Sequence, residues 1–96
     1  MMNIISKLDK AFDSRVRLGI MSILSVNESA DFNTMKQLME LTDGNLASHL
    51  KALEGIGYIQ SVKQFIGRKP NTKYMITKSG KENFKKHLDA LEKLIK

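Results

Sequence analysis

The sequence predicts one small domain that is mostly α-helical with a small β-hairpin (α+β class). Its 96 residues, of which 42% are hydrophobic, can supply one modest core. Apolar residues recur at the i, i+4, i+7 spacing of helix faces along most of the chain. Between Tyr58 and Thr77 the spacing changes to two, as strands require. We therefore expect helices on both sides of a single hairpin.

Two helices are predicted at the start of the chain. The first covers residues 3–12, and the second covers about residues 14–25, with Asp13 or Ser14 as its cap. In each helix, apolar residues return to one face. These residues are Ile5, Leu8 and Phe12 in the first helix and Val16, Ile20, Ile23 and Leu24 in the second. Residues 27–30 form the turn that follows.

A very short strand and a short helix are predicted next. Residues 31–32 form the strand, and residues 35–40 form the helix, with Asn33 or Thr34 as its cap. The inner face of this helix consists of Met35, Leu38 and Met39. Methionines at this spacing are typical of core packing, so we do not interpret them as ligands.

A turn and a longer helix follow. Residues 41–44 form the turn, and the helix covers about residues 43–56, with Thr42 or Asp43 as its cap. Gly57 stands where the end of a helix favours a left-handed residue. Two helices joined by a four-residue turn make a helix-turn-helix.

A hairpin and a final helix complete the predicted order. Apolar and polar residues alternate over residues 58–66, and residues 67–71 (GRKPN) have the composition of a turn. Residues 72–77 form the returning strand, and Thr77 caps a helix over residues 78–96. The apolar stripe of that helix consists of Phe84, Leu88, Leu91, Leu94 and Ile95.

Positive charge is concentrated in the C-terminal part of the chain. The whole chain has 16 Lys and Arg against 10 Asp and Glu, so its formal net charge is +6. Residues 1–57 contain six basic and seven acidic residues and sum to −1, whereas residues 58–96 contain ten and three and sum to +7. Residues 58–81 hold six cations and no acid. Such a block favours a polyanionic partner, DNA or RNA first, over a surface that serves solubility alone.

Several segments, in this order, resemble a known family. Residues 48–59 (SHLKALEGIGYI) resemble the recognition helix and first wing strand of MarR- and ArsR-type winged-helix transcriptional regulators. Residues 13–21 (DSRVRLGIM) resemble the helix that opens that domain, and residues 41–50 (LTDGNLASHL) are similar to a small archaeal and bacterial subgroup of winged-helix DNA-binding domains. The resemblance covers about residues 13–80. It implies a winged helix-turn-helix fold and DNA binding by a transcriptional regulator.

The helix over residues 43–56 has an outer face suited to a DNA groove. At 100° per residue, Leu46, Leu50 and Leu53 share the core face. The opposite face is small and polar, and its amide, hydroxyl and ammonium groups can bond base edges or phosphates in a major groove. Backbone N–H groups at the helix start can also bind a phosphate. The candidate contacts are Thr42, Gly44, Asn45, Ser48, His49 and Lys51. The alternative is an ordinary solvated helix face.

The hairpin supplies a second set of candidate contacts. These are Lys63, Arg68, Lys69 and Lys73. Arg68 and Lys69 stand at the predicted tip, where an arginine can enter a narrow minor groove. Lys63 and Lys73 lie on the predicted strands, where phosphates are the expected partners. The alternative is a lysine-rich edge that prevents strands of different molecules from pairing.

The terminal helices carry more apolar surface than a winged helix of this size needs. We expect one domain over residues 1–96, with an N-terminal helix at residues 1–12, a winged-helix core at residues 13–77 and a C-terminal helix at residues 78–96. The candidate dimer interface consists of Ile5, Leu8, Phe12, Phe84, Leu88, Leu91 and Ile95. A two-fold homodimer would present two recognition helices to successive major grooves, about 34 Å apart. The alternative is that these residues pack on their own domain.

Other classes of protein lack their essential parts here. The chain has no cysteine, which excludes disulfide scaffolds and thiolate metal sites, and we expect neither metal nor cofactor. No Gly-rich phosphate loop is present, and the side chains of Ser48 and His49 diverge by about 100° on a helix, so no enzyme is predicted. No apolar run reaches the roughly 18–20 residues of a membrane span, and no signal-peptide pattern occurs, so we expect a cytoplasmic protein.

The sequence thus predicts a dimeric transcriptional regulator, a repressor, that binds double-stranded DNA sequence-specifically. Two alternatives remain open. One is a winged-helix protein–protein interaction module whose basic hairpin docks on an acidic partner. The other, RNA binding, is less favoured because RNA readers usually offer exposed aromatic rings, whereas Tyr58 and Tyr74 occupy sheet positions and the predicted tip has no aromatic residue. No residue identifies the operator or a small-molecule effector.

Overall fold

Residues 4–96, which a computed structural model describes, combine four α-helices with a three-stranded antiparallel sheet. The elements in order are the 3-10 helices η1 (Ile4–Lys7) and η2 (Lys10–Phe12), α1 (Arg15–Val26), β1 (Ala30–Asp31), α2 (Phe32–Met39), α3 (Asp43–Gly55), β2 (Ile59–Ile66), β3 (Lys69–Ile76) and α4 (Lys78–Ile95). The predicted fold class, mostly α with one small hairpin, is confirmed.

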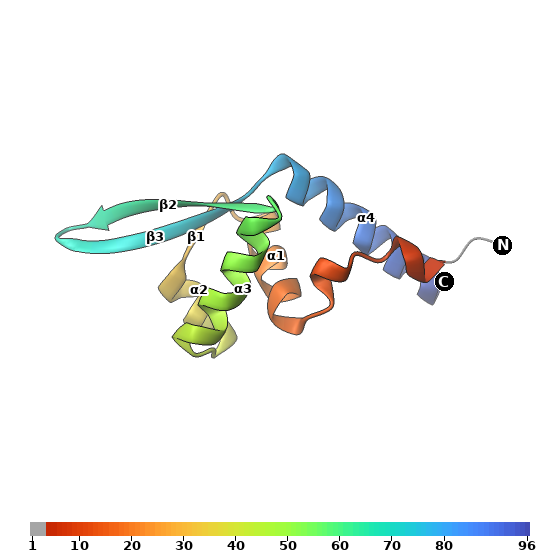
Figure 1. Cartoon of the computed structure of the whole chain (residues 1–96), viewed down its shortest axis with the longest axis horizontal. Helices are drawn as coiled ribbons and strands as arrows, with labels where there is room; N and C mark the ends of the chain where they lie inside the picture. The colour runs from red at the N-terminus through yellow and green to blue at the C-terminus, as the bar shows by residue number, and fades with distance from the viewer. Residues whose placement is uncertain (1–3) are drawn as a thin grey trace.

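The molecule is long and narrow, with the hairpin at one end and α4 at the other (Figure 1). Its principal extents are 57, 25 and 21 Å. The helices α1, α2 and α3 gather in the middle, below the base of the hairpin in this view, and η1 runs beside α4. The two ends therefore offer separate surfaces.

The N-terminal segment differs from the predicted helix over residues 3–12, and that prediction is wrong. From Ile4 onward the segment forms two short 3-10 helices, and the predicted first residue lies outside the described part of the chain. Asp9 separates the two: its carboxylate accepts a hydrogen bond from Ala11 N (2.9 Å), while its own N–H donates to His87 Nδ1 (3.0 Å). An amide committed to another helix cannot continue an α-helical ladder, so the segment turns there.

The start of α2 is also earlier than predicted. The strand before it is Ala30–Asp31, and the helix begins at Phe32, capped by Asp31 rather than by Asn33 or Thr34. The Asp31 carboxylate accepts a hydrogen bond from Thr34 N (2.7 Å), and this bond lowers the pKa of the carboxyl group. Aspartate is among the strongest N-caps, so one residue both ends the strand and starts the helix.

The hairpin is longer and its turn tighter than predicted. The strand order is β1-β3-β2, antiparallel throughout. Ile66 pairs with Lys69, which leaves Gly67 and Arg68 as a two-residue turn, and Gly67 adopts the positive φ (64°) that such turns favour. Pro70 lies within β3, near the tip, on an edge that the short β1 does not reach, where its missing N–H is tolerated.

The core forms where α1 and α3 meet the base of the sheet. Its buried residues are Phe12, Ile20, Met21, Leu24, Met35, Leu46, Leu50, Leu53, Ile59 and Phe84. The predicted inner face of α2 is only partly right, because Leu38 is exposed while Met35 and Met39 pack inward. Met35 and Met39 lie four residues apart on one helix face, and Leu38 is rotated about 100° from Met39.

An aromatic cluster joins the N-terminal segment to both the hairpin base and α4. Phe12 is only 1% exposed, and its ring centroid lies 5.3 Å from that of Phe84, 5.5 Å from that of Tyr58 and 5.0 Å from that of His87. The contacts with Phe84 and His87 are edge-on, the arrangement that aromatic quadrupoles favour. Phe12 thus holds η2 in place although η2 has only three residues.

Two hydrogen bonds through Asp9 reinforce the cluster. The Tyr58 hydroxyl donates to Asp9 Oδ2 (2.6 Å), and Asp9 N donates to His87 Nδ1 (3.0 Å). Burial raises the pKa of Tyr58 from 10.0 to about 12, and the hydrogen bond to Asp9 and the charge of Asp9 act in the same direction. The folded state therefore favours the protonated phenol.

We expect the stability of the protein to fall as the pH rises from about 10 to about 12. The pKa of Tyr58 is higher in the folded protein than in the unfolded one. The contribution of this group to the free energy of unfolding is therefore complete below the unfolded pKa and is lost as the pH rises through the folded pKa. Urea unfolding midpoints measured across this range test the prediction. In the Tyr58→Phe variant this decline in stability should be smaller. Ionisation of Tyr58 near pH 10 in the folded protein, followed by absorbance at 295 nm, would contradict the prediction.

A close approach between α4 and Tyr58, the residue before β2, fixes the base of the hairpin. The helix α3 ends in a Schellman motif, in which Tyr58 N donates to Leu53 O (3.0 Å) and Gly57 has a φ of 83°. The Thr77 hydroxyl donates to Gly57 O (2.6 Å) and accepts from Gly80 N (3.0 Å). Thr77 therefore caps α4 and also joins the start of α4 to the end of α3. A Cβ on Gly80 would lie 2.1 Å from the Tyr58 carbonyl oxygen. Only glycine permits this contact.

Gly80→Ala should lower the free energy of unfolding by at least about 2 kcal/mol, because the new methyl group meets backbone that cannot move without shifting the hairpin or α4. Gly55→Ala is the matched control, since a Cβ there has no atom within 4 Å in its path. That variant should keep or slightly raise stability. Equal urea midpoints for the two variants would contradict this account of the junction.

Within residues 4–96, no helix has both the length and the hydrophobicity that a membrane crossing requires.

Candidate nucleic-acid interface

The helix α3 presents the predicted polar face to solvent. Its core face, Leu46, Leu50 and Leu53, is buried as predicted. Five of the six candidate contacts of this region are exposed: Thr42, Gly44, Asn45, Ser48 and Lys51. Across residues 4–96, no side chain forms a hydrogen bond or ion pair with the side chain of Asn45, Ser48 or Lys51. These groups are therefore available to another molecule.

The start of α3 is already occupied in part. The Thr42 hydroxyl accepts a hydrogen bond from Asn45 N (3.2 Å), so Thr42 is the N-cap and this backbone amide is not free for a phosphate. Asp43 lies in the first turn and forms an ion pair with Lys36 of α2 (2.7 Å). An acid at this position is favoured by the helix dipole. The role of Thr42 in the structure is thus that of a helix cap.

His49 faces α1 rather than the outer face of α3. Arg17 Nε donates to His49 Nδ1 (3.1 Å), and Arg17 Nη1 lies 3.5 Å from Ala11 O as a second donor. His49 is half-buried, and the pair ties α3 to α1 beside the N-terminal segment. Sequence reasoning missed Arg17, because a pair 32 residues apart has no local signature.

The hairpin divides its cations between two faces. Side chains alternate along a strand, so Lys63 shares a face with Ser61. The Ser61 hydroxyl donates to a carboxylate oxygen of Glu54 in α3 (2.6 Å), which shows that this face looks toward α3. Lys69 and Lys73 lie on the opposite face by their register with β2. The four wing candidates are therefore not brought to one surface.

The hairpin cations have no acidic partners in the described chain. Lys63, Arg68 and Lys69 are exposed, and Lys73 is half-buried beside β1. The ion pairs found within residues 4–96 are Lys36–Asp43, Lys85–Asp89 and Lys96–Glu92. None of them involves the hairpin. Its positive charge therefore acts outward, with Arg68 in the turn at the far end of the molecule.

The hairpin end carries an aromatic residue that the sequence analysis did not place there. Phe65 pairs with Pro70, one pair from the two-residue turn, and is 74% exposed. The turn itself, Gly67–Arg68, has no aromatic residue, as expected, but Phe65 stands beside it and is exposed. The end of the hairpin therefore offers an exposed aromatic ring, the feature whose expected absence counted against RNA. The alternation of polar and apolar residues in the sequence includes Phe65, but it does not reveal that Phe65 lies far from the helices.

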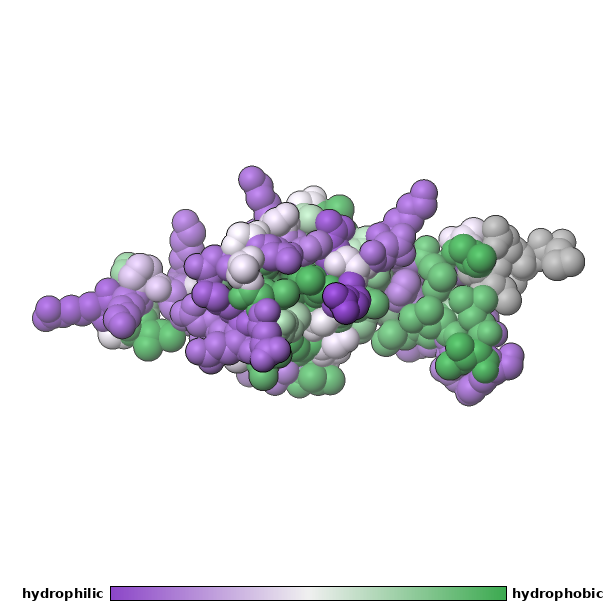
Figure 2. Space-filling view, turned by 90° about the horizontal axis from the view of Figure 1, so that it is seen from below, coloured by the Kyte–Doolittle hydropathy of each residue, from purple (hydrophilic) through white to green (hydrophobic). Residues whose placement is uncertain are grey.

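The predicted dimer surface is divided by the fold. Phe12 and Phe84 are 1% and 5% exposed and pack on each other inside the chain, so they cannot belong to a dimer surface. Leu8 is half-buried. The exposed apolar residues of η1 and the C-terminal half of α4 are Ile5, Leu88, Leu91, Leu94 and Ile95. Figure 2 shows hydrophobic surface gathered at this end of the molecule.

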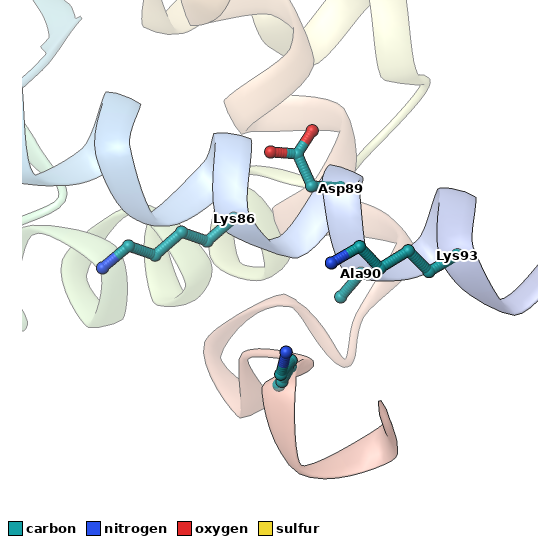
Figure 3. A pocket seen from close by; sticks show the side chains of 5 residues that line it. Lys86, Asp89, Ala90 and Lys93 are labelled. Carbon is teal, nitrogen blue, oxygen red and sulfur yellow. The ribbon is translucent and has the colours of Figure 1, made fainter. Parts of the chain in front are cut away.

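A shallow groove lies between η1 and α4 (Figure 3). Its volume is about 400 Å³, and its lining residues are Lys7, Lys86, Asp89, Ala90 and Lys93. All the charged side chains in it are exposed, and no group of three or more potential ligands in the described residues is placed to hold a metal ion. The groove is thus cationic but has no buried polar group that would select a ligand.

Comparison with known proteins agrees with this geometry. A family model described as a winged helix DNA-binding domain matches residues 16–95. The chain is 38% identical over 87 residues to protein MJ0432 of Methanocaldococcus jannaschii, across 91% of this chain and 95% of the relative. A solved transcriptional regulator homologue from Pyrococcus horikoshii OT3 superposes with a TM-score of 0.77 at 34% identity, over 94% of each chain. The Salmonella typhimurium protein ytfH superposes with a TM-score of 0.72 at 26% identity, over 90% of this chain and 75% of that one.

The helix-turn-helix of α2 and α3 and the hairpin that follows them define a winged helix-turn-helix protein. The chain belongs to the winged helix DNA-binding domain family, whose model spans α1 to the last residue of α4 apart from Arg15. The predicted fold is confirmed by this match.

Proposed function

We propose that this protein is a transcriptional regulator of the MarR/ArsR type that binds double-stranded DNA sequence-specifically in the cytoplasm. The observation that carries the proposal is the pairing of an unoccupied polar face on α3 with a hairpin whose cations have no acidic partner. The similarity to a transcriptional regulator homologue from Pyrococcus horikoshii OT3, over nearly the whole of both chains, supports it.

The two elements have different tasks. The face of α3 with Asn45, Ser48 and Lys51 enters the major groove, where an amide can bond adenine and an ammonium can bond guanine or a phosphate. The wing, residues 63–73, contacts the minor groove and the phosphate backbone, with Arg68 at its end. Lys63 lies on the same side as α3 and reaches the backbone of the same duplex. Base contacts supply specificity, and phosphate contacts supply most of the salt-dependent affinity.

A homodimer completes the proposal. The apolar surface of Ile5, Leu88, Leu91 and Ile95 lies at the end of the molecule opposite the wing, so pairing there leaves both DNA-binding surfaces open. Two α3 helices then read two half-sites of a pseudo-palindrome. Bound across a promoter, such a dimer blocks the polymerase, which makes repression the expected outcome.

Fluorescence anisotropy with two duplexes tests the function. One duplex is the DNA upstream of the gene for this protein, and the other is a scrambled duplex of equal composition. We expect a preference of roughly a thousandfold or more for the first, with affinity falling steeply as salt rises. Equal binding to both duplexes would contradict a specific regulator. Absence of binding at ~0.1 M salt would favour the protein–protein interaction module.

Three variants separate base reading from backbone contact. Asn45→Ala and Ser48→Glu should weaken binding to the preferred duplex much more than binding to the scrambled one, each base contact being worth about 1–3 kcal/mol. Arg68→Ala should weaken binding to both duplexes similarly and reduce the slope of log affinity against log salt concentration by about one. Lys96→Ala, at the end of α4, is the control for loss of one positive charge. Unchanged affinity in Asn45→Ala and Ser48→Glu, with the fold intact, would show that α3 does not read DNA.

Sedimentation at tens of micromolar should give about twice the 10.9 kDa of one chain. Leu88→Glu with Ile95→Glu should yield a monomer, because two charges would be desolvated in the interface. Leu38→Glu, which changes an exposed leucine on α2 (66% exposed, against 45% for Leu88), is the control and should stay dimeric. A wild-type protein that sediments as a monomer would rule out the dimer.

A further inference from the structure

The end of the wing holds apolar side chains that contact little of the rest of the molecule. Phe65 is 74% exposed and Ile66 is 57% exposed, on the outer strand of the sheet. Exposed apolar groups on an edge strand favour aggregation, so a soluble domain gains nothing from them there. Figure 1 shows the hairpin end projecting well away from the helices, so no core residue can cover them.

Phe65 shares its face of the hairpin with the residues that look toward α3. It stands four residues beyond Ser61, and Ser61 is hydrogen-bonded to Glu54 of α3. Its cross-strand partner on that face is Pro70. Seen from the side on which α2 and α3 lie, the hairpin end shows hydrophobic next to hydrophilic surface (Figure 2). A duplex held by α3 therefore lies on the side of the wing that presents Phe65 and Pro70.

The surroundings of Phe65 are cationic. Lys63 lies two residues before it on the same face, and Arg68 and Lys69 follow in the turn and the returning strand. Residues 58–81 contain no acid. An apolar group framed in this way suits a polyanion better than the apolar surface of a protein, because binding a protein would leave three charges desolvated without partners.

We propose that the wing inserts Phe65, backed by Pro70, between base pairs in the minor groove and so kinks the bound DNA. The inference rests on the proposed DNA binding and adds a deformation to it. Phenylalanine and proline are among the apolar wedges with which minor-groove proteins unstack a base step, which bends the duplex by about 20–90° toward the major groove. Arg68 in the turn and Lys69 at the start of β3 hold the phosphates on either side, and the bend brings more of the duplex against the hairpin.

This wedge would give specificity without hydrogen bonds. Unstacking costs least at pyrimidine–purine steps, so DNA sequence under the wing affects affinity even where no base edge is read. The proposed base contacts of α3 and the proposed wedge of the wing then act on different parts of one half-site.

The test measures binding and bending in the same sample. A duplex with the upstream sequence carries a dye at each end, so energy transfer reports bending while anisotropy of one dye reports saturation. At saturation the wild-type protein should raise energy transfer above that of free DNA. Phe65→Ala should bind, with transfer close to that of free DNA. Ile66→Ala, which removes a neighbouring apolar side chain on the opposite face, is the matched control and should bend DNA as the wild type does.

Tryptophan substitution gives an independent readout, because the chain contains no tryptophan. Phe65→Trp should keep the bending, and its emission should be strongly quenched on the duplex by stacking on bases. Ile66→Trp should be quenched much less. Unchanged melting temperatures of the variants confirm that the fold is intact.

The outcomes separate the two proposals. Saturable binding by the wild type without a rise in energy transfer overturns the wedge and leaves the proposed function standing. Equal bending by Phe65→Ala and the wild type also overturns the wedge. No binding to either duplex removes both proposals. Tighter binding to a single-stranded RNA of equal length, lost in Phe65→Ala, would assign Phe65 to base stacking in RNA instead.

Discussion

The contact between the first turn of α4 and the carbonyl group of Tyr58 determines the relative orientation of the two candidate DNA-binding elements, α3 and the hairpin. Gly80 lets the helix approach to a distance that a Cβ would forbid, and Thr77 bonds both the end of α3 and the start of α4. The hairpin begins and ends at this point. Its direction relative to α3 is therefore set by a few backbone contacts at its base, while its far end contacts little. The hairpin is thus an arm that is held at its base, next to the end of α3.

The aromatic cluster around Phe12 extends the same junction to the N-terminal segment. Phe12 lies in η2, His87 in α4 and Tyr58 directly before β2, and Asp9 bonds both Tyr58 and His87. Buried polar groups of this kind are stable only when each has a partner, and in the described residues every buried side-chain nitrogen and oxygen has one. The charged arm and the apolar end of α4 consequently stand at opposite ends of one connected body.

Much of this arrangement could be predicted from local sequence. The spacing of Leu46, Leu50 and Leu53 identified α3 and its outer face, and Gly57 identified its end, because these are properties of single helices. Three of the errors occurred where tertiary contacts decide. The 3-10 form of the N-terminal segment depends on His87, which lies 78 residues from Asp9, and the position of His49 depends on Arg17. The sequence predicts Phe12 and Phe84 in a dimer interface, because an apolar stripe does not show which of its residues pack against the rest of the same chain.

The most direct test of the central claim, that α3 and the wing together form the DNA-binding surface, is an NMR titration of the 15N-labelled protein with its upstream duplex. The account predicts the largest amide shifts along the outer face of α3 and in the wing, residues 63–73, and little change in the C-terminal half of α4. Large shifts confined to α4 and η1, or shifts in the wing with none in α3, would contradict it.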